Sequence, residues 1–139
     1  MTEEQLTKIE SQLGLKLPEF YRSTMLNYPF PVNSFADEFL LANYPEQVLE
    51  LNHQPVECSG TGRPFLVGSD GGEELYCIDL QNFESPVYTL QLETGKHFQK
   101  AENWTQYLHQ IEADLKEIEE DEKREQERKA SKKWWEFWK

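Results

Sequence analysis

The chain has 139 residues, of which 14 are lysine or arginine and 26 are aspartate or glutamate, so its formal net charge is −12. This length accommodates one domain with a single hydrophobic core. Two cysteines are too few for a disulfide scaffold or a four-cysteine zinc site. No apolar run approaches the roughly 18 residues of a membrane span, and the acidic N-terminal segment is unlike a secretion signal. We therefore expect a soluble, cytoplasmic protein.

The whole net negative charge is carried by the first 115 residues. This region contains 18 acidic and six basic residues, whereas residues 116–139 contain eight of each and are neutral overall. A domain of this charge repels nucleic acids and anionic lipids, and it attracts basic proteins. The same charge can also serve solubility alone, and both interpretations stay open at this point. Nucleic-acid binding is not expected.

The first third of the chain is predicted to be mainly helical. Thr2 and Gln5 have the spacing of a capping box that begins a helix, and Gly14 is suited to end it. A second helix is expected to begin at Leu17-Pro18 and to end before the prolines that follow Tyr28. Residues 38–41 are a candidate for a short strand, and a third helix is expected from residue 43.

The middle of the chain is predicted to form an antiparallel sheet. Residues 65–69 and 74–80 alternate as strands do, and Asp70-Gly71-Gly72 between them is typical of a hairpin turn. Residues 86–92 are a third strand, and a fourth is expected at residues 96–99.

A long helix is expected after Asn103, which is suited to cap it. One face is apolar at spacings of three and four residues, through Trp104, Tyr107, Leu108, Ile111, Leu115 and Ile118. The helix then becomes charged on all sides, with favourable i,i+4 pairs. We therefore divide the chain into a domain of residues 1–118 and a charged helical extension, residues 119–139, with a Trp-rich tail. The order of helices, strands and helix predicts an α+β fold with the long C-terminal helix packed on the sheet.

Two motifs resemble the SUKH superfamily, which includes the cell-wall-assembly-regulator domain and bacterial toxin-immunity domains. The first is Leu13-Gly14-Leu15-Lys16-Leu17-Pro18-Glu19-Phe20-Tyr21, and the second runs from Val67 to Asp79 through the Asp70-Gly71-Gly72 turn. The segment that begins at Trp104 is an imperfect match to the family's closing helix, which has phenylalanine there. The resemblance implies an α+β domain that binds proteins. For bacterial members it implies an immunity role, in which the domain neutralises a toxin that is often a nuclease.

No arrangement of residues predicts catalysis, a cofactor or a metal. His53, His97 and His109 are far apart and lack a metal-binding spacing. Cys58 and Cys77 lack a CxxC spacing, and Cys77 alternates with its neighbours as a core residue of a strand does. The protein is therefore expected not to be an enzyme.

Two groups of residues are instead candidates for binding a partner. The acidic candidates are Asp70, Glu73, Glu74 and Asp79, which we expect on or beside one turn, and Glu84, which we expect just beyond the next strand. The aromatic candidates are Trp134, Trp135, Phe137 and Trp138 in the tail. The tail has three alternatives, which are packing on its own domain, docking on a partner or a second copy, and lying at a membrane interface. Six residues are too few for an amphipathic membrane anchor on their own, which disfavours the last.

The leading hypothesis is a non-catalytic immunity-type protein that blocks a basic toxin, in particular a nuclease, with its acidic face. The alternative is a regulatory adaptor that recruits cellular proteins through the acidic domain and the aromatic tail. Homo-oligomerisation through the tail is compatible with both hypotheses.

Overall fold

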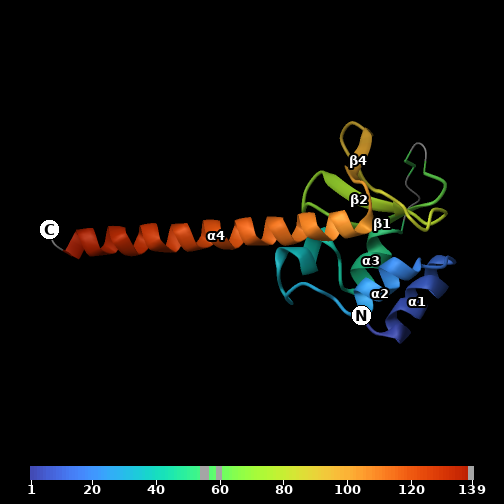
Figure 1. Ribbon diagram of the computed structural model, residues 1–139, viewed down its shortest axis with the longest axis horizontal. Coiled ribbons are helices and arrows are strands. Elements are labelled where there is room, and N and C mark those ends of the chain that lie inside the picture. The colour runs from blue at the N-terminus through green and yellow to red at the C-terminus, as the bar shows by residue number, and fades with distance from the viewer. Residues whose placement is uncertain (54–56, 59–60, 138–139) are drawn as a thin grey trace.

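The computed structural model describes residues 1–53, 57–58 and 61–137. The elements, in chain order, are α1 (Glu3–Leu13), α2 (Glu19–Leu26), the π-helix η1 (Ala36–Leu40), α3 (Pro45–Leu51), β1 (Pro64–Ser69), β2 (Glu74–Asp79), β3 (Val87–Gln91), β4 (His97–Ala101) and α4 (Trp104–Phe137). Helices come first, strands second and the long helix last, which confirms the predicted α+β fold. Figure 1 shows α4 projecting far beyond the body formed by the other elements.

The four strands form one sheet in the order β1-β2-β3-β4, and each neighbouring pair is antiparallel. The free side of β1 is covered by the chain that precedes it. Ala42 N–H donates to the Val67 carbonyl at 3.0 Å, and the Asn52 amide bonds both the N–H and the carbonyl of Leu66, at 2.8 and 2.9 Å. The four strands that we predicted for the sheet are therefore correct, and their bounds shift by one or two residues.

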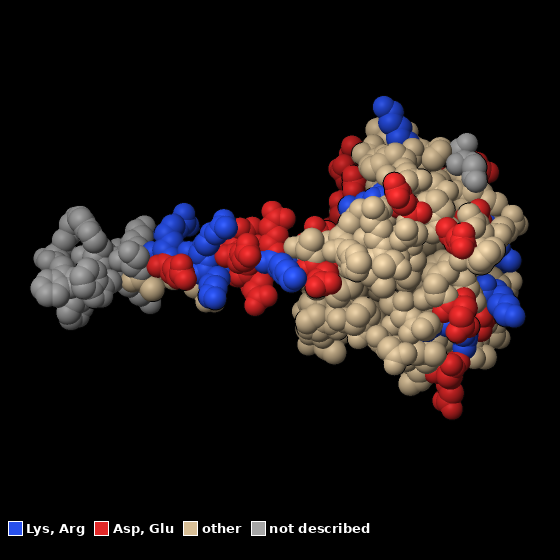
Figure 2. All heavy atoms as spheres, viewed as in Figure 1, with Lys and Arg blue, Asp and Glu red and all other residues tan. Residues whose placement is uncertain are grey.

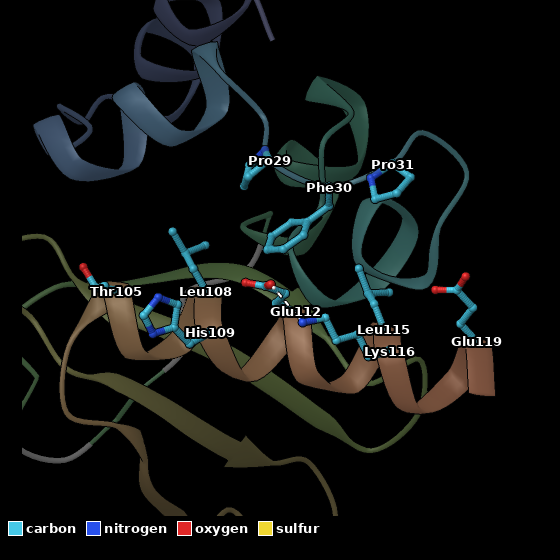
Figure 3. Close-up of a pocket in the computed structure, with 10 residues that line it drawn as sticks. All are labelled: Pro29, Phe30, Pro31, Thr105, Leu108, His109, Glu112, Leu115, Lys116 and Glu119. Atoms are coloured by element: carbon cyan, nitrogen blue, oxygen red, sulfur yellow. Dashed lines mark ion pairs between the residues drawn. The ribbon is translucent and has the colours of Figure 1, made fainter. Parts of the chain in front are cut away.

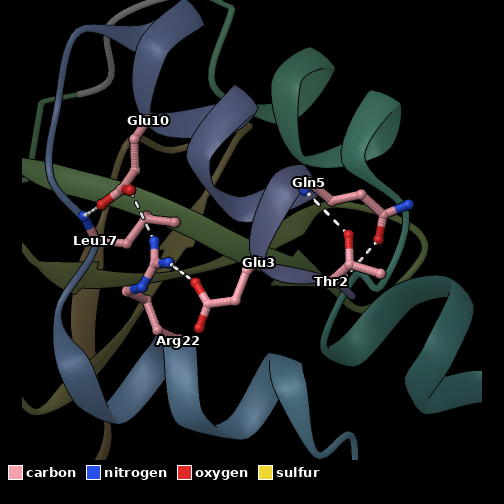
Figure 4. Close-up of polar contacts among 6 residues, drawn as sticks. All are labelled: Thr2, Glu3, Gln5, Glu10, Leu17 and Arg22. Atoms are coloured by element: carbon pink, nitrogen blue, oxygen red, sulfur yellow. Dashed lines mark hydrogen bonds and ion pairs between the residues drawn. The ribbon is translucent and has the colours of Figure 1, made fainter.

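The N-terminal helices are held by the polar contacts drawn in Figure 4. Gln5 N–H donates to the Thr2 hydroxyl at 3.2 Å, and Thr2 N–H donates to the Gln5 side chain at 2.9 Å, which confirms the capping box. Glu10 of α1 accepts from Arg22 of α2 at 2.7 Å and from Leu17 N–H at 2.8 Å. The second helix begins one residue later than predicted, because Pro18 is its N-cap.

Residues 38–41 do not form the short strand that we predicted. Residues 36–40 form the π-helix η1, closed by Leu41 N–H donating to the Ala36 carbonyl at 2.9 Å. The buried Asp37 side chain fixes its beginning by accepting from Asn33 N–H at 2.9 Å and from the Tyr44 hydroxyl at 2.6 Å. Burial of this carboxylate within a local hydrogen-bonded loop therefore overrides the strand propensity of the apolar residues beside it.

The start of α4 packs against the sheet, as predicted, and also against η1. Trp104, Tyr107 and Ile111 are buried, and the Tyr107 ring lies 5.8 Å from the Tyr76 ring of β2. Asn103 caps the helix through its side-chain oxygen, which accepts from Gln106 N–H at 2.8 Å. Burial ends gradually, because Leu115 is half-buried and Ile118 is 37% exposed.

Two isoleucines on this helix provide a matched test of where the core ends. Ile111 is 1% exposed and Ile118 is 37% exposed. We expect Ile111→Ala to lower the free energy of unfolding by about 2–5 kcal/mol, because it leaves a cavity in the core. Ile118→Ala should lower it by less than about 1 kcal/mol. Urea denaturation of the two variants measures both values, and equal losses would contradict a core that ends before Ile118.

Candidate protein-binding surfaces

Three of the predicted acidic residues lie at one end of the sheet. Asp70 and Glu73 are in the turn between β1 and β2, and Glu74 is the first residue of β2. The Asp70 carboxylate accepts from Gly72 N–H at 2.8 Å and from Glu74 N–H at 3.1 Å, so it also shapes the turn. The Glu73 side chain is exposed and the Glu74 side chain is half-buried.

A fourth carboxylate lies at the same end, and sequence reasoning did not select it. Leu92 N–H donates to the Glu73 carbonyl at 2.9 Å, which brings the turn between β3 and β4 beside the turn between β1 and β2. Glu93 follows Leu92 and is exposed. An antiparallel order β1-β2-β3-β4 puts these two turns at one end, so the predicted topology contained the signal. We call Asp70, Glu73, Glu74 and Glu93 the hairpin-end surface.

Asp79 does not lie beside that turn, which corrects our expectation, whereas Glu84 follows β2 as expected. Asp79 is the last residue of β2, about 17 Å from Glu74 at 3.3 Å per residue, and Glu84 lies in the turn that follows. The Asp79 side chain is 9% exposed and accepts from the N–H groups of Gly62, Arg63 and Gln81 at 3.0–3.2 Å. Burial would raise the pKa of this carboxyl, but the three backbone hydrogen bonds outweigh it and lower the pKa. Asp79 therefore holds the loop before β1 and the turn after β2 together, and the Glu84 side chain is exposed.

The SMI1 / KNR4 family (SUKH-1) matches residues 1–110, which is most of the chain. The chain belongs to this family. The match includes the hairpin-end surface and the buried start of α4, and it ends before the projecting part of that helix. SUKH domains often bind partner proteins, are generally non-catalytic, and include toxin-immunity proteins. Comparison with curated proteins and with solved structures returns no significant match.

The histidines and cysteines of this SUKH-1 domain occupy different environments. His53, His97 and His109 are exposed, whereas Cys58 and Cys77 are buried in a small apolar cluster with Leu66. Burial raises the pKa of the Cys77 thiol to about 12, so this thiol is neutral at physiological pH. Within residues 1–53, 57–58 and 61–137, no three metal-binding side chains gather as a metal site requires. The same residues contain no helix that is long and apolar enough to cross a membrane.

The body of the SUKH-1 protein has an apolar groove where α4 begins to project, and we call it the Phe30 groove. Its volume is about 440 Å³. One wall is Phe30 with its flanking prolines, and the other is α4, where Leu108 and Leu115 face the groove (Figure 3). Glu112 and Lys116 form an ion pair of 3.4 Å at its edge. The sequence did not reveal this groove, because Leu108 and Leu115 have the spacing of core residues. In the structure they are only half-buried.

The aromatic tail lies at the other end of α4. The helix backbone continues to Phe137, so Trp134, Trp135 and Phe137 belong to its last turn. Their side chains, and the whole of Trp138, lie outside the described residues. The described part of α4 is therefore what indicates whether the tail packs on its own domain, docks on a partner or second copy, or lies at a membrane.

Proposed function

We propose that this SUKH-1 protein is a non-catalytic immunity protein that binds a basic toxin domain in the cytoplasm. The observation that carries the proposal is the concentration of the net charge of −12 in residues 1–115, with four carboxylates at the hairpin-end surface. Membership of a family that includes toxin-immunity proteins supports it.

A nuclease is the class of toxin that best complements this surface. An enzyme that binds phosphodiester backbones needs basic residues around its active site, and a patch of carboxylates is attracted to the same residues. The hairpin-end carboxylates belong to adjacent turns, so they can approach one basic face together. Occupation of that face would exclude the nucleic acid and stop cleavage without any chemistry by the immunity protein.

The projecting helix favours a second candidate function, that of a regulatory adaptor. The family match ends at residue 110, while α4 continues to Phe137 and residues 116–130 are all exposed. Such an extension can contact a cellular protein independently of the domain. A toxin gene directly upstream would favour the immunity role, and its absence would favour the adaptor.

Charge reversal at the hairpin-end surface tests the immunity role. We expect Glu73→Lys with Glu93→Lys to slow association with the neighbouring gene's toxin domain at least tenfold, because electrostatic steering is lost. The wild-type association rate should also fall about tenfold between low and physiological ionic strength. Stopped-flow fluorescence measures both rates.

Glu84→Lys is the matched control, because Glu84 is equally exposed and lies at the other end of the sheet. Its association rate should stay within about threefold of the wild type, since one distant charge changes the steering field only slightly. Equal slowing by both variants would show that net charge, and not the hairpin-end surface, directs binding. Association of the double variant at the wild-type rate would place the interface elsewhere.

A further inference from the structure

The projecting part of α4 has its acidic and basic residues in separate blocks. From Glu117 to Glu122, five of six residues are acidic, whereas residues 123–133 include six basic and two acidic residues. Figure 2 shows the acidic block next to the body and basic residues farther out. The surface that best complements such a helix is a second copy of it in the opposite direction, because each acidic block then meets a basic one.

The Phe30 groove and the aromatic tail are complementary in chemistry, but they cannot meet within one chain. Leu115 lines the groove, and Trp134 lies 19 residues farther along the same helix. At 1.5 Å per residue these positions are about 28 Å apart. Because α4 is continuous from Trp104 to Phe137, its tail cannot return to its own groove. An antiparallel second copy brings its tail to this place.

One antiparallel register both pairs opposite charges and brings the aromatic tail of each copy to the Phe30 groove of the other. With Trp134 of one copy level with Leu115 of the other, four pairs of opposite charge lie level along the helices: Glu117 with Lys132, Glu120 with Lys129, Asp121 with Arg128, and Arg124 with Glu125. The like-charged pairs between residues 116 and 133 are Lys116 with Lys133 and Glu122 with Glu127. Lys116 already has a partner in Glu112, which partly offsets the first of these. Opposite charges therefore outnumber like charges in the register that fills the groove.

We propose that two copies of this chain form an antiparallel dimer through α4, with the aromatic tail of each copy in the Phe30 groove of the other. The dimer is symmetric, so every contact occurs twice. The polar middle of the helices supplies register and orientation, and the two groove contacts supply apolar burial. Eight aromatic side chains at about 150–250 Å² each provide an area in the range that stable interfaces bury. This inference does not depend on the proposed toxin partner.

A charge-swap experiment tests the register. Variant one is Glu120→Lys with Asp121→Lys, and variant two is Arg128→Glu with Lys129→Glu. Each variant alone places like charges level with each other, so its dimer dissociation constant should rise at least tenfold in sedimentation velocity. An equimolar mixture should form a heterodimer with an affinity near that of the wild type, because every altered pair is again of opposite charge. Circular dichroism checks that both variants keep the helix.

Single cysteines test the direction of the two helices. The native Cys58 and Cys77 are buried, so cysteines introduced on α4 react first. Arg124→Cys should form a disulfide-linked dimer, because position 124 is level with position 125 of the other copy. Lys116→Cys should not, because its equivalent in the other copy is about 26 Å away along the axis. Cross-linking at both positions would indicate a parallel dimer and overturn the proposal.

Removal of residues 134–139 tests the role of the groove. We expect the shortened chain to be monomeric with an unchanged unfolding midpoint for the domain, measured at a concentration where the wild type is also monomeric. A wild-type chain that remains monomeric at high concentration would overturn the proposal. So would a charge-swap mixture that does not dimerise, or a monomer whose tail binds vesicles of anionic phospholipid instead.

Discussion

Gly68→Ala should strongly lower the free energy of unfolding. A Cβ at position 68 would lie 2.2 Å from the Leu40 carbonyl oxygen and 2.5 Å from the Phe39 carbonyl oxygen. Both atoms belong to the backbone of η1, which cannot move away without uncovering its buried residues. We expect a loss of about 3 kcal/mol or more in the free energy of unfolding, a large share of the stability of a small domain. Urea denaturation followed by circular dichroism measures the loss.

Gly72→Ala is the control for this prediction. Its Cβ would meet only the Asp70 carboxylate at 3.6 Å, which is an ordinary contact distance. The position is exposed, so the variant should stay within about 0.5 kcal/mol of the wild type. If the two variants unfold at the same urea concentration, η1 does not pack against β1 as described.

Asp37→Ala should be destabilising for a different reason. The Asp37 carboxylate is fully buried and accepts hydrogen bonds from Asn33 N–H, the Tyr44 hydroxyl and, at 3.1 Å, the Asn43 amide. Alanine removes the acceptor and leaves these three donors unpaired. We expect this to lower the free energy of unfolding by about 3 kcal/mol. Glu38→Ala is the matched control, because the next side chain along is exposed and should contribute less than about 0.5 kcal/mol.

The loss caused by Asp37→Ala should depend on pH. Burial alone would raise the pKa of Asp37, but hydrogen bonds from Tyr44, Asn33 and Asn43 outweigh it, and the pKa is lowered. A carboxyl group whose pKa is lower in the folded state stabilises the protein fully above its unfolded pKa of about 3.9. That stabilisation is lost as pH falls through the folded pKa. The difference between wild type and variant, measured by urea denaturation, should therefore be constant near neutrality and shrink below about pH 4. A difference that grows in acid would contradict this assignment.

Local signals in the sequence were sufficient for most of the fold. The Thr2 capping box, Gly14, the Asp70-Gly71-Gly72 turn and the Asn103 cap each act within a few residues, so their consequences can be read from a short window. The apolar stripe of α4 also predicted its contact with the sheet. The extent of the buried face was harder to predict. Leu108 and Leu115 have the same helical spacing as Ile111, but they face the Phe30 groove.

The features that the sequence did not reveal depend on contacts that a short sequence pattern does not specify. Residues 38–41 look like a strand until Asp37 is seen to be enclosed by Asn33 and Tyr44. Asp79 looks like a surface carboxylate until the loop at residues 61–63 returns to bond it. Glu93 joins the hairpin-end surface only because β3 pairs with β2. In each case the role of an acidic residue is set by contacts that form only when the chain has folded.

The two edges of the sheet differ in how easily they could accept a foreign strand. At β1 the Asn52 amide imitates a neighbouring strand by bonding both backbone groups of Leu66, so that position offers nothing to an incoming chain. The other edge strand, β4, is five residues long and mostly exposed. Lys96 and Lys100 flank or occupy it, and lysine on a short edge strand opposes pairing between molecules. At one edge a side chain occupies the backbone groups of Leu66, and at the other the strand is short and carries lysine. We therefore expect neither edge to pair readily with a strand of another molecule.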